Sequence, residues 1–167
     1  MRKALAYIRV AVAALMAVAA TSCNNNGCLE NQSAVPRCGF YSSSSKKTVS
    51  LDSISVYAVG VPGDSMLVRC GTVSQLYMPL NMSSDVTRYV LHYDAQLLSD
   101  VRLNDTLTIN YERVPYFVSH ECGAMYYFDV KEYSCTDHLI DSVKITTERF
   151  TNLDVETIQF YMRTREE

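Results

Sequence analysis

Hydrophobic and polar residues alternate along most of this chain, which is the pattern of half-buried β-strands. The clearest segment is residues 106–114, in which Leu107, Ile109 and Tyr111 fall on one face and polar residues on the other. Alternation of this kind, with one polar face, is typical of antiparallel sheets. Strands are expected at residues 35–41, 49–60, 65–70, 76–80, 86–94, 106–114, 124–133, 142–148 and 155–162.

The same alternation predicts which side chains point inward. The inward residues are expected to be Ile54, Val56, Ala58, Thr87, Tyr89, Leu91, Tyr93, Ala124, Tyr126, Phe128, Val130, Val143, Ile145, Ile158, Phe160 and Met162. Only residues 95–102 are expected to form a helical turn, and the serine run 42–45 is expected to be a hairpin loop. Eight or nine short strands with polar connections predict one antiparallel β-sandwich, immunoglobulin-like or transthyretin-like, over residues 35–167.

The first 22 residues have the pattern of a secretory signal peptide. Arg2, Lys3 and Arg9 precede an apolar run of 11 residues, Val10 to Ala20. This run is shorter than the roughly 20 residues that span a bilayer. The small residues 20–22 before Cys23 resemble the lipobox of bacterial lipoproteins, which predicts lipidation of Cys23. The alternative is ordinary cleavage near Ala20, with Cys23 joining a disulfide.

Residues 23–34 are expected to be a lipidated cysteine followed by a polar tether. A chain so anchored is expected at the outer membrane. The first acidic residue after Cys23 is Glu30, so the acidic stretch that directs similar lipoproteins to the cell surface is not evident. We therefore expect the domain to face the periplasm, with surface display as the alternative.

Charge and motifs exclude several functions. The formal net charge is −3, whereas nucleic-acid binders carry basic patches or stripes. The chain has no P-loop, dinucleotide-binding glycine motif, EF-hand loop or serine nucleophile elbow. No cofactor, catalytic group or metal ligand is therefore assigned.

The expected export would place the six cysteines in an oxidising compartment, where disulfides form and persist. If Cys23 carries lipid, the remaining five are Cys28, Cys38, Cys70, Cys122 and Cys135. An odd number leaves at least one thiol without a partner in the chain. Two bridges among five cysteines allow 15 arrangements, and their spacing does not choose among them.

One short segment groups residues able to do chemistry. His120 and Cys122 lie two positions apart, so on a strand both side chains point to one face. A zinc site would need two further ligands, for which Asp137 and His138 are the candidates. The spacing matches no standard zinc motif, and the alternative is that Cys122 forms a disulfide while His120 lies in an exposed loop. His92, in a predicted strand, is expected at the surface beside Asp94.

Aromatic residues concentrate in the second half of the chain. Tyrosines are enriched in binding surfaces, and Tyr116, Tyr126 and Tyr127 form the candidate binding surface. Tyrosine also favours half-buried strand positions for purely structural reasons. The concentrated residues are Tyr111, Tyr116, Phe117, Tyr126, Tyr127, Phe128 and Tyr133.

Several motifs resemble a family of small uncharacterised lipoproteins from gut Bacteroidales. The most specific is YFVSHECG at residues 116–123. The others are the lipobox cysteine, Gly27-Cys28, Pro36-Arg37, Asp64-Ser65, LYMPL at 76–80, Asp105-Thr106-Leu107 with Ile109-Asn110-Tyr111, Ile140 to Val143 and Ile158 to Tyr161. The resemblance covers most of residues 23–163 and implies a Cys28–Cys122 disulfide. It carries no activity, and Cys38, Cys70 and Cys135 depart from its pattern.

The chain is therefore expected to be an outer-membrane-anchored lipoprotein whose β-sandwich binds or supports an envelope protein or glycan without catalysis. One alternative is a hydrolase or metal-dependent envelope enzyme centred on His120 and Cys122. Another is an accessory subunit of an envelope protein complex.

Overall fold

The computed structural model describes Cys28, residues 31–60 and residues 65–163. The predicted all-β class is confirmed, with ten strands in these residues in place of eight or nine. The described residues contain no helix long and apolar enough to cross a membrane. The elements are β1 (Arg37–Ser42), β2 (Leu51–Val59), β3 (Met66–Val73), β4 (Gln75–Tyr77), β5 (Val86–Tyr93), the 3-10 turn η1 (Val101–Leu103), β6 (Asp105–Ser119), β7 (Gly123–Cys135), β8 (Ile140–Ile145), β9 (Arg149–Phe150) and β10 (Glu156–Met162).

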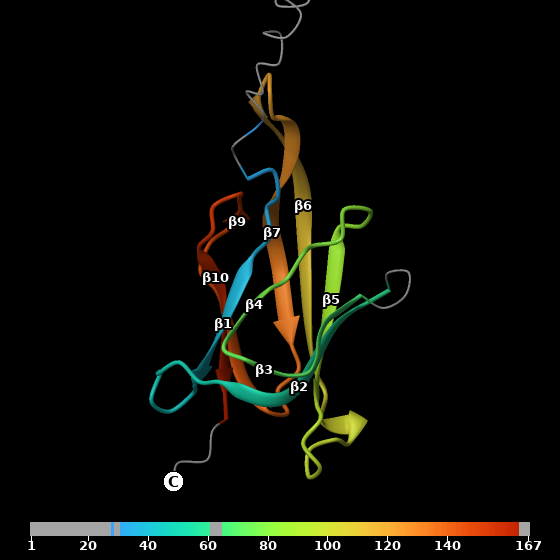
Figure 1. Ribbon diagram of the computed structural model, residues 1–167, viewed down its shortest axis with the longest axis vertical. Helices are drawn as coiled ribbons and strands as arrows, with labels where there is room; N and C mark the ends of the chain where they lie inside the picture. The colour runs from blue at the N-terminus through green and yellow to red at the C-terminus, as the bar shows by residue number, and fades with distance from the viewer. Residues whose placement is uncertain (1–27, 29–30, 61–64, 164–167) are drawn as a thin grey trace, which may run out of the picture.

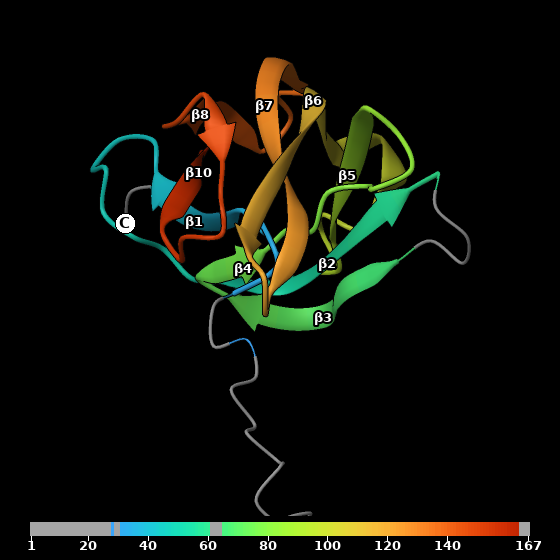
Figure 2. The ribbon, with the colours of Figure 1, turned by 90° about the horizontal axis from the view of Figure 1, so that it is seen from above.

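The strands form two sheets that share one hydrophobic core. One sheet has the order β4-β1-β10-β8 and the other β3-β2-β5-β6-β7-β9. Seen from above, β8, β10 and β1 lie on one side of the molecule, and β2, β3 and β5 lie on the other (Figure 2). Phe40 of β1 stacks on Phe160 of β10, with ring centroids 5.2 Å apart. The core joins these rings to fully buried residues of the second sheet, namely Ile54, Val56, Tyr89, Leu91, Leu107 and Ile109.

The serine run turns back on β1 as a hairpin loop, as expected, but the chain after the turn continues into the other sheet. β1 and β2 belong to different sheets, so the serine-rich segment after Tyr41 crosses between sheets. An antiparallel bridge from Tyr41 to Thr48 holds its base, and the Val49 amide donates to the Phe40 carbonyl at 2.9 Å. β1 pairs instead with β10, and in parallel. The sheets are thus mostly, but not wholly, antiparallel.

The longest feature is the hairpin of β6 and β7, which reaches beyond the other strands at the top of the molecule (Figure 1). β6 has 15 residues and β7 has 13. At about 3.3 Å per residue, β6 is roughly 46 Å long. Its first half packs in the core, and the half beyond Tyr111 is largely exposed. The hairpin end therefore reaches beyond the other strands, while Met125 stays buried and Val118 packs against the core cluster.

The predicted inward faces are confirmed in β2, β5, β10 and the first half of β6. In β7 the prediction is partly wrong, because Met125 is buried while Ala124 and Tyr126 are exposed. Met125 is buried because residues 32–35, which line a pocket together with it, cover its face of the hairpin. A bulge at Lys131 shifts the alternation only for the last residues of β7, since Asn110 pairs with Glu132 and Tyr111 pairs with Val130.

Candidate functional site

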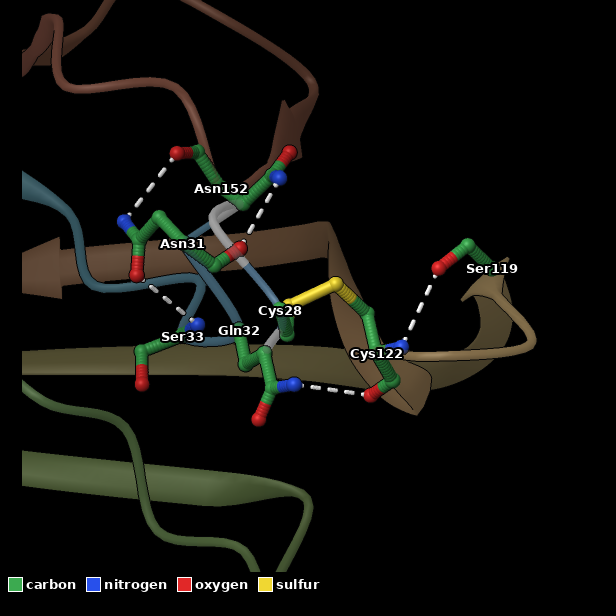
Figure 3. The surroundings of a disulfide bond; sticks show 7 residues. All are labelled: Cys28, Asn31, Gln32, Ser33, Ser119, Cys122 and Asn152. Carbon is green, nitrogen blue, oxygen red and sulfur yellow. Dashed lines mark hydrogen bonds between the residues drawn. A yellow bond between two sulfur atoms is a disulfide. The ribbon is translucent and has the colours of Figure 1, made fainter. Parts of the chain in front are cut away.

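A disulfide joins Cys28 to Cys122, so the N-terminal segment is bonded to the end of the β6–β7 hairpin (Figure 3). The Cα atoms of the two cysteines are 4.7 Å apart. The turn that carries Cys122 is fixed locally, because its amide donates to Ser119 Oγ at 3.0 Å. Gly123 follows with φ +73°, a left-handed conformation that favours glycine.

Polar contacts continue this attachment down the hairpin from Cys28 (Figure 3). Gln32 Nε2 donates to the Cys122 carbonyl at 2.8 Å. The Asn31 and Asn152 side-chain amides each donate to the other residue's carbonyl, at 3.1 and 3.0 Å. Ala34 is buried just before β1. Cys28 and residues 31–34, expected to belong to a tether, thus contact the domain, while Cys23 lies outside the described residues.

The three tyrosines of the candidate binding surface do not share one face. Tyr116 stacks on Tyr127 with ring centroids 4.3 Å apart. Tyr127 Oη donates to Asn152 Oδ1 at 3.0 Å, which ties this pair to the loop before β10. Neighbouring residues of a strand point to opposite faces, so Tyr126 lies on the other side of the hairpin from Tyr127.

Phe117, which the sequence analysis did not single out as a site residue, shares the Tyr126 side of the hairpin. Phe117 pairs with Ala124 and Pro115 pairs with Tyr126, which places these four residues on one face. The Phe117 ring lies edge-on to His120 at 5.6 Å. No sequence pattern marked Phe117, because the extension of the hairpin past residue 114 is evident only from the strand pairing.

The residues considered for a zinc site are not brought together. His120 and Cys122 lie at the hairpin end, and Cys122 is in the disulfide. His138 lies at the opposite end of β6, where its Nδ1 is 3.3 Å from Asp105. Within the described part of the chain, no three histidine, cysteine or acidic residues are placed to hold a metal ion.

Asp105 organises that opposite end. Its carboxylate is fully buried and accepts hydrogen bonds from the amides of His138, Leu139 and Ile140 at 2.8–2.9 Å. The Tyr93 hydroxyl donates at 2.8 Å. Burial alone raises the pKa of Asp105, but the amide and hydroxyl donors outweigh it and hold the pKa below its ordinary value. This group fixes the connection from β7 to β8 and is structural.

His92 lies half-buried on β5, closer to the protein interior than the surface position expected for it. Its Nδ1 is 2.7 Å from Asn104 Oδ1, and its Nε2 is 3.7 Å from Asp94. The expected neighbour Asp94 is therefore present.

A groove of about 770 Å³ lies between β7 and the segment that leads from the end of β8 into β9. Several of its charged groups are paired: Lys131 Nζ lies 2.8 Å from Glu112, and Arg149 forms an ion pair with Asp129. Hydrogen bonding by Arg149 lowers the pKa of Asp129. The lining residues are Asp129 to Tyr133 and Ile145 to Arg149.

The remaining three cysteines of the described residues are free thiols. Cys38 is fully buried, Cys135 is half-buried and Cys70 is exposed. Burial raises the pKa of both Cys38 and Cys135 to about 12. Since the thiolate is the reactive form, neither of these two thiols is activated.

We expect N-ethylmaleimide to modify Cys70 in the folded protein and to leave Cys38 and Cys135 unmodified until urea is added. The reason is the exposure of Cys70 together with the raised pKa of the other two thiols. Peptide mass spectrometry of a time course measures the three rates separately. Modification of Cys38 as fast as Cys70 without urea would contradict the burial seen here.

Comparison with known proteins gives one family match. Residues 53–162 match DUF6452, a family of unknown function. This match spans β2 to β10 and includes the whole β6–β7 hairpin. No curated protein and no solved structure matches the chain.

Proposed function

This chain belongs to DUF6452, a family of unknown function, and from that premise we propose that it is a lipid-anchored β-sandwich module of the bacterial outer membrane. In this proposal the domain faces the periplasm and binds an envelope partner without catalysing a reaction. Its signal-like N-terminus and Cys23 supply the anchor, and the two sheets with their shared core supply a rigid body.

The observation that carries the proposal is the disulfide at the hairpin end. A polypeptide coming from Cys23 meets the domain at Cys28, which is bonded to Cys122 at the end of the longest axis. An anchor at this point lets the domain stand away from the bilayer. The groove between β7 and the β8–β9 segment then lies away from the anchored end and is open to a partner.

Mass spectrometry of the mature N-terminus tests the anchor. We expect the N-terminal residue to be Cys23 carrying a thioether-linked diacylglycerol, and the protein to fractionate with the outer membrane. Cys23→Ser should abolish the lipid and release the chain, while Cys70→Ser, which changes an exposed free thiol, should leave both unchanged. An unlipidated mature chain that begins before Cys23 would overturn the anchor.

The groove favours a partner with an extended polypeptide segment. β8 is an edge strand of its sheet, and β7 beyond Val130 pairs with β6 on one side only in the described strand pairings. Exposed strand edges of this kind accept an added strand. A photo-crosslinking residue in place of Tyr133 should capture a protein partner in intact cells, and the same residue in place of Leu97 should not. Equal products from both positions would argue against the groove.

A further inference from the structure

The hairpin end is the part of the domain closest to the proposed lipid. Cys23 lies five residues before Cys28, and five residues span at most about 18 Å when fully extended. Cys28 is bonded in turn to Cys122 of the hairpin turn. With the 4.7 Å between the Cα atoms of Cys28 and Cys122 added, a lipid on Cys23 would keep the hairpin turn within roughly 23 Å of the bilayer surface.

The surface of the hairpin end is aromatic and nearly free of charge. Phe117 is 60% exposed, and Tyr116 and Tyr126 are each 42% exposed. Within residues 114–126 there is no lysine or arginine, and the only carboxylate belongs to Glu121. Aromatic side chains with this much exposure and so little charge around them are characteristic of the membrane–water interface.

The aromatic side chains lie on both faces of the hairpin. Tyr116 is on the face of Tyr127, whereas Phe117 and Tyr126 are on the other face. A protein partner that packs against a two-stranded ribbon covers one face and leaves the other in water. A lipid interface surrounds an inserted end and contacts both faces, so the distribution favours a lipid surface.

We propose that the hairpin end, residues 114–126, inserts its exposed aromatic side chains into the interfacial region of the bilayer that carries the Cys23 lipid. This inference rests on the proposed lipid anchor and adds a second contact to it. A lipid attached at one residue leaves the domain free to reorient, and a second contact with the bilayer fixes its orientation. The groove between β7 and the β8–β9 segment would then be held away from the membrane, because Tyr133 lies roughly 23 Å along β7 from Tyr126.

The chain has no tryptophan, so one introduced indole reports on one position. Phe117→Trp places it at the hairpin end. The matched control is Leu97→Trp, at a residue that is 93% exposed in the loop before η1 and β6, toward the opposite end of β6. The full-length mature lipoprotein carrying either substitution is reconstituted in phosphatidylcholine vesicles, with or without bromine on the acyl chains near the glycerol.

Brominated lipid should quench the emission of the F117W protein at least about twofold and leave that of the L97W protein nearly unchanged. High salt should not alter the quenching, because phosphatidylcholine has no net charge and residues 114–126 contain no lysine or arginine. Tyr126→Trp is the second variant and should behave like Phe117→Trp. Far-ultraviolet circular dichroism establishes that each variant is folded.

The outcomes separate the two proposals. If both proteins float with the vesicles and brominated lipid does not quench F117W or Y126W, the insertion is wrong and the anchor stands; a protein partner would then be the occupant of this surface. If the proteins carry no lipid and do not float, the anchor is wrong and the insertion with it.

The disulfide gives a further arm of the experiment. In the F117W background, Cys28→Ser combined with Cys122→Ser should leave the protein bound to vesicles through its lipid. Quenching should fall toward that of the L97W control, because the hairpin end is no longer tied to the anchored segment. Undiminished quenching would overturn the role of the disulfide in holding the hairpin at the bilayer.

Discussion

Asp105→Ala is expected to lower the free energy of unfolding by about 3–5 kcal/mol, the largest effect we predict for a single substitution. The carboxylate accepts five hydrogen bonds at 3.0 Å or less, three of them from consecutive backbone amides. The donors are Tyr93, Thr136, His138, Leu139 and Ile140. An amide N–H left unsatisfied costs about 1–3 kcal/mol, and water reaching the exposed His138 reduces the total.

Asp105→Asn should also destabilise the protein, by about 2–3 kcal/mol. Oδ1 accepts from the His138 amide, while Oδ2 accepts from the amides of Leu139 and Ile140. Either orientation of a carboxamide therefore turns its NH₂ group toward a backbone donor. Asparagine has nearly the shape of aspartate and still cannot satisfy this site.

Urea unfolding followed by circular dichroism measures both variants. Asp141→Asn is the matched control, because Asp141 is exposed and lies 3.7 Å from Arg163 in a surface ion pair. Its effect should stay within about 0.5 kcal/mol. If Asp105→Ala lowered the free energy of unfolding no more than Asp141→Asn does, the buried carboxylate would not organise the β7–β8 connection.

The same carboxylate should make stability depend on pH in acid. Its donors hold the pKa of Asp105 below the ordinary value of about 3.9. A lowered folded-state pKa contributes stability that is fully present above the unfolded-state pKa and is lost as the pH falls through the folded-state pKa. As the pH falls below 4, the free energy of unfolding of the Asp105→Asn variant should accordingly decrease less steeply than that of the wild type.

Alternation in the sequence predicted the strands wherever one face meets the core. In β5 the expected inward residues Tyr89 and Leu91 are fully buried, and in β10 Ile158 and Phe160 are as well. The prediction failed where burial has another cause. Expected strand 106–114 continues to Ser119 because pairing with β7 persists after the strand leaves the core, and no alternation marks that extension.

Non-local contacts account for what the sequence did not predict. Met125 is buried on the hairpin near residues 32–35, which line the same pocket, and part of that segment was taken for a tether. In the sequence Asp105 looks like any acidic residue of a loop. Its role depends on three backbone amides that lie 33 to 35 residues later in the chain and donate to its carboxylate. The parallel pairing of β1 with β10 joins distant parts of the chain. The exposed position of Phe117 at the hairpin end is evident only from the structure.

Removal of the Cys28–Cys122 disulfide, by Cys28→Ser with Cys122→Ser, is expected to lower the free energy of unfolding by about 2–4 kcal/mol. The bond closes a segment with a sequence separation of 94, so it restricts the unfolded chain strongly. A loop of this size would give nearly 5 kcal/mol from chain entropy alone. The expected value is smaller because, without the bond, Cys28 and the hairpin end gain freedom in the folded state.

Urea unfolding of the oxidised wild type, the reduced wild type and the double serine variant measures this contribution. The reduced wild type and the variant should coincide, and reductant should not shift the variant. Cys70→Ser, at an exposed free thiol, is the control and should stay within about 0.5 kcal/mol of the wild type. Equal midpoints for the oxidised wild type and the variant would contradict the prediction.

Hydrogen exchange distinguishes where the lost stability resides. Beyond Tyr111 the hairpin is held by its own strand pairing, by Arg113 with Asp85 and the Met82 carbonyl, and by Tyr127 with Asn152. At its end the polar contact is that of Gln32 with the Cys122 carbonyl. Without the disulfide, amides of residues 114–126 should exchange fastest, whereas those of β5 and the first half of β6 should change only by the loss in global stability. Faster exchange confined to β5 and the first half of β6 would show that the bond acts on the core and not on the hairpin end. A hairpin end that loosens on its own would lose the fixed relation to the anchored segment on which the proposed membrane contact depends.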